Sequence, residues 1–214
     1  MFDIPYMQLH GYLEALIGSR TSINLMRALI NHPGRVFTVR KLAEAAKVSA
    51  SEAAIYVQQL EKYGVLNIQP VGRAYLLSLN DQSYILNHIF KPMIKAETQT
   101  LDELISILRD NLGDTKAKTS IISAVLFGSV VTKVDREDSD VDLLVISEDF
   151  DEATTLVSKA QEKISLAFNS RLSPLIMNQK EVIKKKNDSL IQSILANCII
   201  VTGKDLREIL ESND

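Results

Sequence analysis

Two aspartates separated by a single residue, Asp140 and Asp142, open an apolar segment and constrain this chain more than any other feature. A second apolar segment, residues 121–127, precedes them and ends in Gly128-Ser129. Side chains two residues apart on a strand leave the same face, so the two carboxylates converge on one point. Such a pair favours a bound divalent cation. Mg²⁺ (or Mn²⁺) is commonly coordinated by carboxylates together with substrate phosphates.

The Gly128-Ser129 pair offers the phosphate half of such a site. Gly128 leaves the backbone N–H groups unhindered, Ser129 adds a hydroxyl, and a helix is expected to begin there. Phosphate binds well at a helix N-terminus. The alternative is a solvated acidic loop beside an ordinary tight turn. That alternative does not explain why two acids enter a strand as hydrophobic as residues 141–146.

This combination resembles the signature of the nucleotidyltransferase superfamily related to DNA polymerase beta, in which Gly-Ser, a spacer of similar length and Asp-x-Asp follow one another. Gly128, Ser129, Asp140 and Asp142 all match. More narrowly, the chain resembles small prokaryotic proteins with a winged-helix domain in front of a minimal nucleotidyltransferase domain. The resemblance implies that Asp140 and Asp142 are catalytic and hold the metal. It also implies that Gly128 and Ser129 bind the β,γ-phosphates of a nucleoside triphosphate.

One part of that signature is missing. The resemblance implies a third carboxylate on a following strand, where it ligates metal or takes a proton from the attacking hydroxyl. The strand expected at residues 172–177 holds no acid. Glu181 comes after this strand, where its simpler interpretation is an acid in the first turn of a helix beginning at Gln179. Metal and nucleotide binding need only the first two aspartates.

The second half of the chain alternates strand-like and helical segments, which predicts a mixed sheet with flanking helices. Strands are expected at residues 121–127, 141–147, 172–177 and 199–202. Helices are expected after Ser129 and over residues 150–168, 179–186, 190–197 and 204–211. The first of these strands is apolar on both faces, as for a strand covered on both sides.

The first 80 residues predict three helices and a two-stranded hairpin, an order that resembles a winged helix-turn-helix. The elements are expected at residues 19–31, 38–46, 49–63, 65–69 and 74–79. Ser49 and Glu52 form a capping box that opens the third helix. Its core-facing positions are expected to be Ala53, Val57, Leu60 and Tyr63. In such a module the third helix enters the major groove of DNA.

The DNA-contact candidates are the outward polar residues of that helix and of the wing tip: Ser51, Gln58, Gln59, Lys62 and Arg73. Gln58 and Gln59 suit adenine edges, and Arg73 suits a phosphate. The alternative is a solvated polar surface, because the helix exposes one lysine and also Ile55. In that case the domain contacts protein rather than DNA.

Two domains joined by a connector are therefore predicted: a winged-helix domain at residues 1–80, a helical connector at 81–113 and a nucleotidyltransferase domain at 114–214. The fold class is two-domain, α/β and α+β. The connector is expected to be two helices kinked at Pro92. Its apolar stripe is either domain core or the seam of a homodimer, since winged-helix regulators commonly pair to match DNA half-sites.

The composition limits the expected cellular location of the protein and the kinds of metal site or disulfide it can form. The chain has 214 residues, 46% of them hydrophobic, and no apolar run long enough to cross a membrane. Its N-terminus lacks a signal-peptide pattern, so a cytoplasmic location is expected. Cys198 is the single cysteine, which excludes an internal disulfide, and the three histidines lack zinc-ligand spacing. Residues 1–100 hold 10 Lys+Arg and 7 Asp+Glu, against 14 and 20 in residues 101–214.

The predicted function is metal-dependent transfer of a nucleoside monophosphate from a nucleoside triphosphate to a hydroxyl acceptor. The sequence does not identify the acceptor, and a hydroxyl group on a protein is one candidate. The winged helix adds double-stranded DNA or protein as a second partner. The alternative is a transcriptional regulator whose nucleotidyltransferase domain is degenerate and senses nucleotide or dimerises. A third interpretation, one partner of a toxin–antitoxin pair, comes from family analogy alone.

Overall fold

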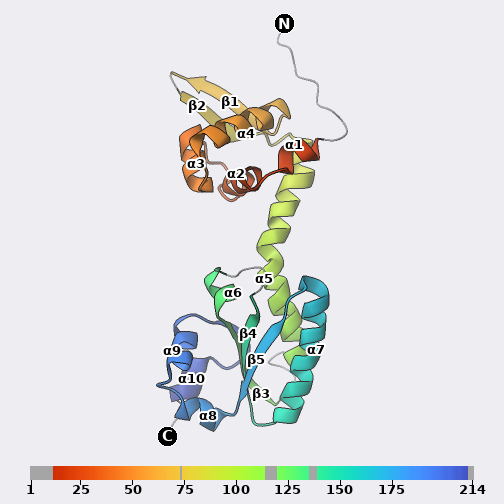
Figure 1. Ribbon diagram of the computed structural model, residues 1–214, viewed down its shortest axis with the longest axis vertical. Coiled ribbons are helices and arrows are strands. Elements are labelled where there is room, and N and C mark those ends of the chain that lie inside the picture. Colours follow the sequence, from red (N-terminus) through yellow and green to blue (C-terminus); the bar gives the residue numbers. More distant parts are fainter. Residues whose placement is uncertain (1–11, 73, 114–119, 135–138, 212–214) are drawn as a thin grey trace. The chain divides into compact units, whose positions relative to one another are not determined.

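The structure of the protein is a computed structural model that describes residues 12–72, 74–113, 120–134 and 139–211. The chain divides into two compact units, Met1–Gln99 and Thr100–Asp214 (Figure 1). Each unit has its own apolar core. Helix α5, Lys91–Leu112, belongs to both, because its residues lie on either side of the division.

The first unit contains three main helices and a hairpin, in the order expected for a winged helix. The elements are α1 (Leu13–Ile17), α2 (Arg20–Ile30), α3 (Val39–Ala46), α4 (Ala50–Lys62), β1 (Leu66–Val71) and β2 (Ala74–Leu79). Ser19, Thr38 and Ser49 cap α2, α3 and α4, each by accepting a backbone hydrogen bond three residues on. β1 pairs antiparallel with β2, and Phe37 forms a bridge to Leu77.

The core of this unit is built from one face of each helix. Ala53, Val57 and Leu60 of α4 are buried as predicted, while Tyr63 is half-buried against the core. Tyr56, which the sequence did not single out, is 5% exposed, and its hydroxyl donates a 2.5 Å hydrogen bond to the Leu16 carbonyl. Burial raises the pKa of the Tyr56 phenol above its usual range, so the group stays a donor at neutral pH.

Replacing Tyr56 with Phe should lower the free energy of unfolding by about 1–2 kcal/mol, because the buried Leu16 carbonyl loses its donor while the ring stays in place. Urea denaturation followed by circular dichroism measures the change. Tyr75→Phe is the matched control, since Tyr75 is 60% exposed on β2. A loss of the same size in both variants would contradict the role given to the Tyr56 hydroxyl.

The connector differs from the predicted pair of kinked helices. A π-helical turn, Leu86–Phe90, runs directly into α5, and the Lys91 N–H reaches back to the Leu86 carbonyl. Pro92, the second residue of α5, lacks an N–H, and the π-helical turn stands directly before it in the same continuous helical run. The apolar stripe on α5 is domain core at Leu104, Leu108 and Leu112, which are buried.

The second unit has a four-stranded mixed sheet, which confirms the predicted fold of this half. Its strands are β3 (Ile121–Phe127), β4 (Val141–Ser147), β5 (Leu172–Met177) and β6 (Ile199–Gly203), in the order β5-β4-β3-β6. β3 runs antiparallel to β4 and β6, and β4 runs parallel to β5. The helices are α6 (Ser129–Thr132), α7 (Phe150–Phe168), α8 (Gln179–Lys184), α9 (Ser189–Ala196) and α10 (Leu206–Glu211).

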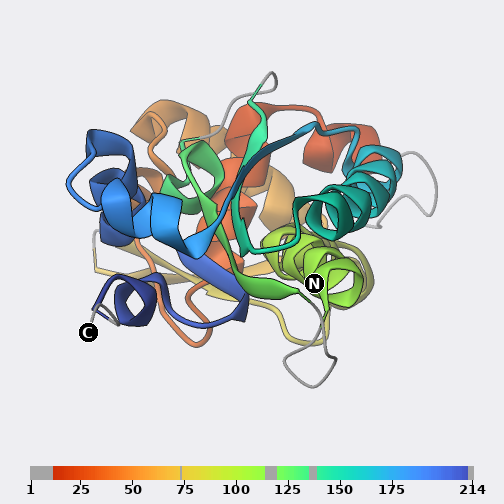
Figure 2. The ribbon, with the colours of Figure 1, turned by 90° about the horizontal axis from the view of Figure 1, so that it is seen from below.

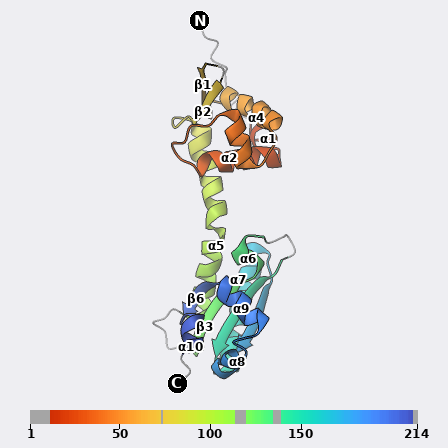
Figure 3. The same cartoon turned by 90° about the vertical axis from the view of Figure 1, so that its left-hand side faces the viewer.

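Helices cover both faces of this sheet. One core packs the sheet against α7 and the C-terminal part of α5, and the other packs it against α8, α9 and α10 (Figure 2). At the β6 edge, next to the end of α5 (Figure 3), the Arg109 Nε donates to the Val201 carbonyl at 3.0 Å. The Thr202 hydroxyl donates to the Gly113 carbonyl at 2.7 Å. In the described parts of the chain, no helix combines the length and apolarity needed to cross a bilayer.

Candidate functional site

The sheet register brings the Gly-Ser turn against the Asp-x-Asp pair. β3 and β4 are antiparallel with Phe127 opposite Asp142, so Gly128 follows directly beside that aspartate. A Cβ atom added to Gly128 would lie 2.1 Å from Asp142 Oδ2 and 3.1 Å from Asp142 Cγ, so the Asp142 carboxylate would have to move. Gly128 also adopts φ 76° and ψ −150°, a region that only glycine occupies readily. The contact with Asp142 and the positive φ therefore both favour glycine at position 128.

The two aspartates share one electrostatic environment. Asp142 is half-buried in β4, and Asp140 stands exposed just before the strand. Burial, followed by the negative charge of Asp140, raises the pKa of the Asp142 carboxyl above its usual range. A cation between the two carboxylates would relieve this unfavourable pairing, so the donor set fits a divalent metal. Within the described residues, however, no group of three or more acidic, His or Cys side chains comes together.

The backbone after Gly128 presents the donors expected for phosphate. α6 begins at Ser129 as predicted, but it is one turn long and ends at Lys133 in the left-handed conformation. The Thr132 N–H and hydroxyl both bond the Gly128 carbonyl, at 3.2 and 3.1 Å. N–H groups in the first turn of a helix have no intrahelical acceptor. These donors and the Ser129 hydroxyl, rather than a helix macrodipole, are what this short turn can offer a phosphate.

The position beside Asp142 on the next strand is Ser173. β5 runs parallel to β4 with Ser173 opposite Asp142, so both side chains leave the same face of the sheet. The Val141 N–H donates to the Arg171 carbonyl at 2.8 Å, which places Arg171 alongside Asp140 in the same register. The sequence had shown that this strand lacks an acid. It could not show which residues stand beside the pair.

Glu181 has a structural role. It is the third residue of α8 and forms a capping box with Asn178, whose side chain accepts from the Glu181 N–H at 2.8 Å. In return, Glu181 Oε2 accepts from the Asn178 N–H at 3.1 Å. The interpretation of Glu181 as a first-turn helix acid is confirmed.

Replacing Gly128 with Ala should weaken nucleotide binding at least about tenfold and lower the free energy of unfolding by about 1–3 kcal/mol. The added methyl group displaces the Asp142 carboxylate, and the backbone is strained for any L-residue. Calorimetric titration and thermal unfolding measure the two effects. Gly72→Ala is the control, because Gly72 also has a positive φ, 60°, but open space around its Cβ position. Strain without loss of binding would show that the carboxylate is not needed where it stands.

The predicted DNA-contact residues form a stripe on α4. Ser51, Gln58 and Lys62 are exposed, and with Ile55, 63% exposed, they follow helical spacing along one face. Gln59 is half-buried beside this stripe. Arg73 lies outside the described residues. The stripe has the geometry of a recognition helix but carries one cationic residue, Lys62.

Comparison with known proteins supports the interpretation of the second unit. Residues 101–201 match the family model of the nucleotidyltransferase domain, and the match contains all four residues of the Gly-Ser and Asp-x-Asp pairs. Over these residues the chain is therefore similar to nucleotidyltransferase domains. A search among curated proteins found no match.

Three solved structures illustrate the weaker likenesses. A toxin–antitoxin structure with AMP-PNP is 19% identical at TM-score 0.34, covering 52% of this chain and 81% of its own. A mutant of the toxin–antitoxin pair MntA-HpeT is 16% identical at TM-score 0.35, covering 51% and 79%. A MarR family transcriptional regulator from Streptomyces coelicolor in complex with DNA is 20% identical at TM-score 0.31, covering 50% and 78%. Scores this low carry no argument about function.

Proposed function

We propose that the second unit binds a nucleoside triphosphate together with Mg²⁺ or Mn²⁺ and transfers the nucleoside monophosphate to a hydroxyl acceptor. A new bond forms between the acceptor oxygen and the α-phosphorus, the bond from the α-phosphorus to the bridging oxygen of the β-phosphate breaks, pyrophosphate leaves, and the hydroxyl proton passes to water. The observation that carries this proposal is the packing of Gly128 against the Asp142 carboxylate, with Asp140 beside it. The family match at residues 101–201 agrees with it.

Each residue has a defined task in this proposal. Asp140 and Asp142 would hold the cation, whose charge would neutralise the triphosphate and lower the pKa of the acceptor hydroxyl. The N–H groups at the start of α6 and the Ser129 hydroxyl donate to the terminal phosphates. Rate enhancement then comes mainly from positioning and charge neutralisation, as in other phosphoryl transfers. With Ser173 beside Asp142, the sheet supplies no third carboxylate to take the acceptor's proton.

Calorimetric titration of ATP, GTP, CTP and UTP, each with and without Mg²⁺, tests the binding step. We expect metal-dependent binding of at least one nucleotide. Incubation with each labelled triphosphate, scored for pyrophosphate release and label transfer, tests turnover. The proposal fails if none of the four nucleotides binds in a metal-dependent way.

A second candidate function is favoured by Ser173. A domain that keeps Gly128 and both aspartates but lacks the third acid can bind a metal–nucleotide complex without turning it over. The protein would then be a nucleotide-responsive regulator, with the first unit as its DNA-binding part. Metal-dependent binding without pyrophosphate release would select this candidate. A homodimer and a cytoplasmic location stay predictions in either case.

For the first unit we propose binding to double-stranded DNA through the exposed stripe of α4. Few cations are available, so few counterions are released and the dependence on salt should be shallow. Lys62→Ala should reduce the salt slope by about 1 and weaken binding equally across sequences, whereas Gln58→Ala should relax preference at particular base pairs. Gel-shift titrations over a salt series measure both effects. Lys95→Ala, on the exposed surface of α5, is the control, and a complete lack of binding at low salt would make the unit a protein-interaction module.

A further inference from the structure

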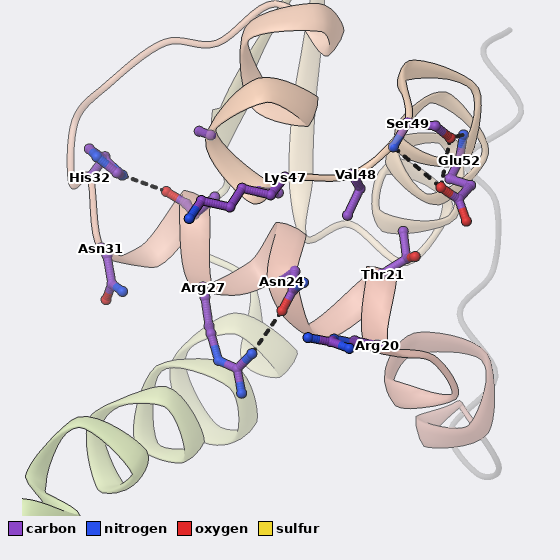
Figure 4. Close-up of a pocket in the computed structure, with 13 residues that line it drawn as sticks. Arg20, Thr21, Asn24, Arg27, Asn31, His32, Lys47, Val48, Ser49 and Glu52 are labelled. Carbon is purple, nitrogen blue, oxygen red and sulfur yellow. Dashed lines mark hydrogen bonds between the residues drawn. The ribbon is translucent and has the colours of Figure 1, made fainter. Parts of the chain in front are cut away.

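The first unit contains a polar hollow of about 700 Å³ between α2, the end of α3 and the start of α4 (Figure 4). Its lining comes from three separate helices and is mainly charged or hydrogen-bonding. The lining residues used below are Arg20, Asn24, Arg27, Lys47, Val48 and Glu52. None of the predicted DNA-contact residues on α4 belongs to the lining. The hollow is therefore a different feature from the exposed stripe.

The hollow has a surplus of positive charge. Arg20, Arg27 and Lys47 contribute three cationic groups to the lining, and Glu52 is its one acidic residue. Figure 4 shows Arg20 and Arg27 on either side of Asn24, and Lys47 extending from the end of α3 toward the side of the hollow where His32 and Asn31 lie. Among the described residues, neither Arg20 nor Lys47 has an ion pair or a side-chain hydrogen bond. Both side chains can therefore bind a ligand without breaking an existing contact.

The other charged groups of the lining are already engaged. Glu52 accepts hydrogen bonds from the Ser49 N–H at 3.3 Å and the Ser49 hydroxyl at 2.6 Å, as the acid of its capping box. Arg27 donates from Nη1 to Asn24 Oδ1 at 2.8 Å and from Nε to Glu97 Oε2 at 2.6 Å. Glu52 thus stays directed toward the backbone of α4 and Arg27 toward Glu97, which leaves Arg20 and Lys47 as the cationic groups available to a ligand.

Lys47 reaches the hollow from an unusual backbone. It is the C-cap of α3 in the left-handed conformation, with φ 54°, where glycine is the common residue. Its N–H bonds the carbonyls of Ala43 and Glu44, which fixes the direction of the chain at this point. The cap thus fixes the point from which the Lys47 side chain leaves the end of α3 toward the hollow.

We propose that this hollow binds a small phosphate-bearing anion, recognised by Arg20 and Lys47. Arg20 and Lys47 are two cationic groups of the lining with no ion pair among the described residues, and guanidinium and ammonium groups are the usual phosphate ligands. Asn24 and Thr21 supply further hydrogen-bonding groups, and Val48 offers an apolar contact to the organic part. The hollow is open to solvent, with Arg20 and Lys47 both exposed, and its volume of about 700 Å³ suits a small ligand.

The hollow is connected to α5 through Arg27. The guanidinium of Arg27 pairs with Glu97, a residue of α5, and the same helix is buried in the second core at Leu104. An anion that draws Arg27 toward the hollow weakens its pairing with Glu97 and changes a contact of α5. The Arg27–Glu97 pair therefore competes with the ligand for the Arg27 guanidinium.

Calorimetric titration of the full chain with inorganic phosphate, in EDTA and at low ionic strength, tests the proposal. We expect saturable binding that weakens about tenfold in Arg20→Ala and in Lys47→Gly. Lys47→Gly removes the cation and also suits the left-handed backbone, so the fold is preserved. Arg40→Ala is the matched control, because Arg40 lies on α3 and pairs with Glu44 outside the hollow. Asp142→Asn should not alter phosphate binding, which separates this site from the metal–nucleotide site.

Two further measurements complete the test. Glu97→Gln frees Arg27 and should strengthen phosphate binding about threefold. Gel-shift titration of Arg20→Ala and Lys47→Gly with duplex DNA should show no change from the wild-type protein. Absence of saturable phosphate binding would overturn the proposal, as would equal affinity in the wild-type protein and both variants. Loss of DNA affinity without any phosphate binding would assign the surface to DNA and also overturn it.

Discussion

Asp142→Asn removes metal-dependent nucleotide binding, with an expected loss of at least about 100-fold in affinity for the metal–nucleotide complex. The substitution keeps the shape of the side chain but deletes one of two carboxylates that hold the cation. Asp140→Asn should act in the same direction, because Asp140 supplies the other. Titration of each variant with the best-binding triphosphate and Mg²⁺ measures the loss. Glu181→Gln is the control, since Glu181 caps α8.

Thermal unfolding provides a second, independent measurement on the Asp142→Asn variant. The pKa of the Asp142 carboxyl is raised in the folded state, so its charged form opposes folding and the fold gains stability as the pH falls through that pKa. Asn carries no charge, so the variant should unfold at the same or a higher temperature at neutral pH and lose this acid-side gain. Thermal unfolding in EDTA over a pH series checks it. Equal losses of binding in Asp140→Asn, Asp142→Asn and Glu181→Gln would instead place Glu181 in the site.

The sequence was sufficient to predict the elements that carry the site. Strong apolar runs bounded by turn residues located β3, β4 and β5, and the Ser49–Glu52 capping box located the start of α4. These signals are local, because a helix cap or an apolar strand is encoded by a few consecutive residues. The pairing of Gly128 with Asp142 followed only in outline. The sequence showed two ends of neighbouring strands, but not the register that sets them in contact.

Features that depend on contacts distant in the sequence were not accessible. The buried Tyr56 hydroxyl donates to the Leu16 carbonyl, 40 residues away in the chain. No local sequence pattern predicts such a partner. The hollow beside Lys47 needs three helices to assemble before its charges meet. Ser173 became important only when β5 was placed parallel to β4, because a shift of one residue would have turned its side chain to the other face.

Because Ser173 stands beside Asp142 in this register, Ser173→Asp is expected to raise nucleotide transfer strongly, whereas Asp142→Asn lowers nucleotide binding. A carboxylate at this position would stand beside Asp142 on the same face, where it can complete the metal ligands or accept the acceptor's proton. General base catalysis contributes about 10²–10⁴-fold, so nucleotide transfer should rise by at least about 100-fold over the wild-type protein. Label transfer and pyrophosphate release from a labelled triphosphate with Mg²⁺ measure the gain.

Ser173→Asn is the matched control, because it has the size of aspartate without the charge and should leave turnover at the wild-type level. The third carboxylate also adds repulsion to the pair already present, so Ser173→Asp should unfold at a lower temperature in EDTA and recover when Mg²⁺ is added. Recovery with Mg²⁺ but no gain in transfer would show that the new acid binds metal while the acceptor's proton leaves by another route. Neither recovery nor gain, in a protein that still binds nucleotide, would show that the residue beside Asp142 does not limit this domain.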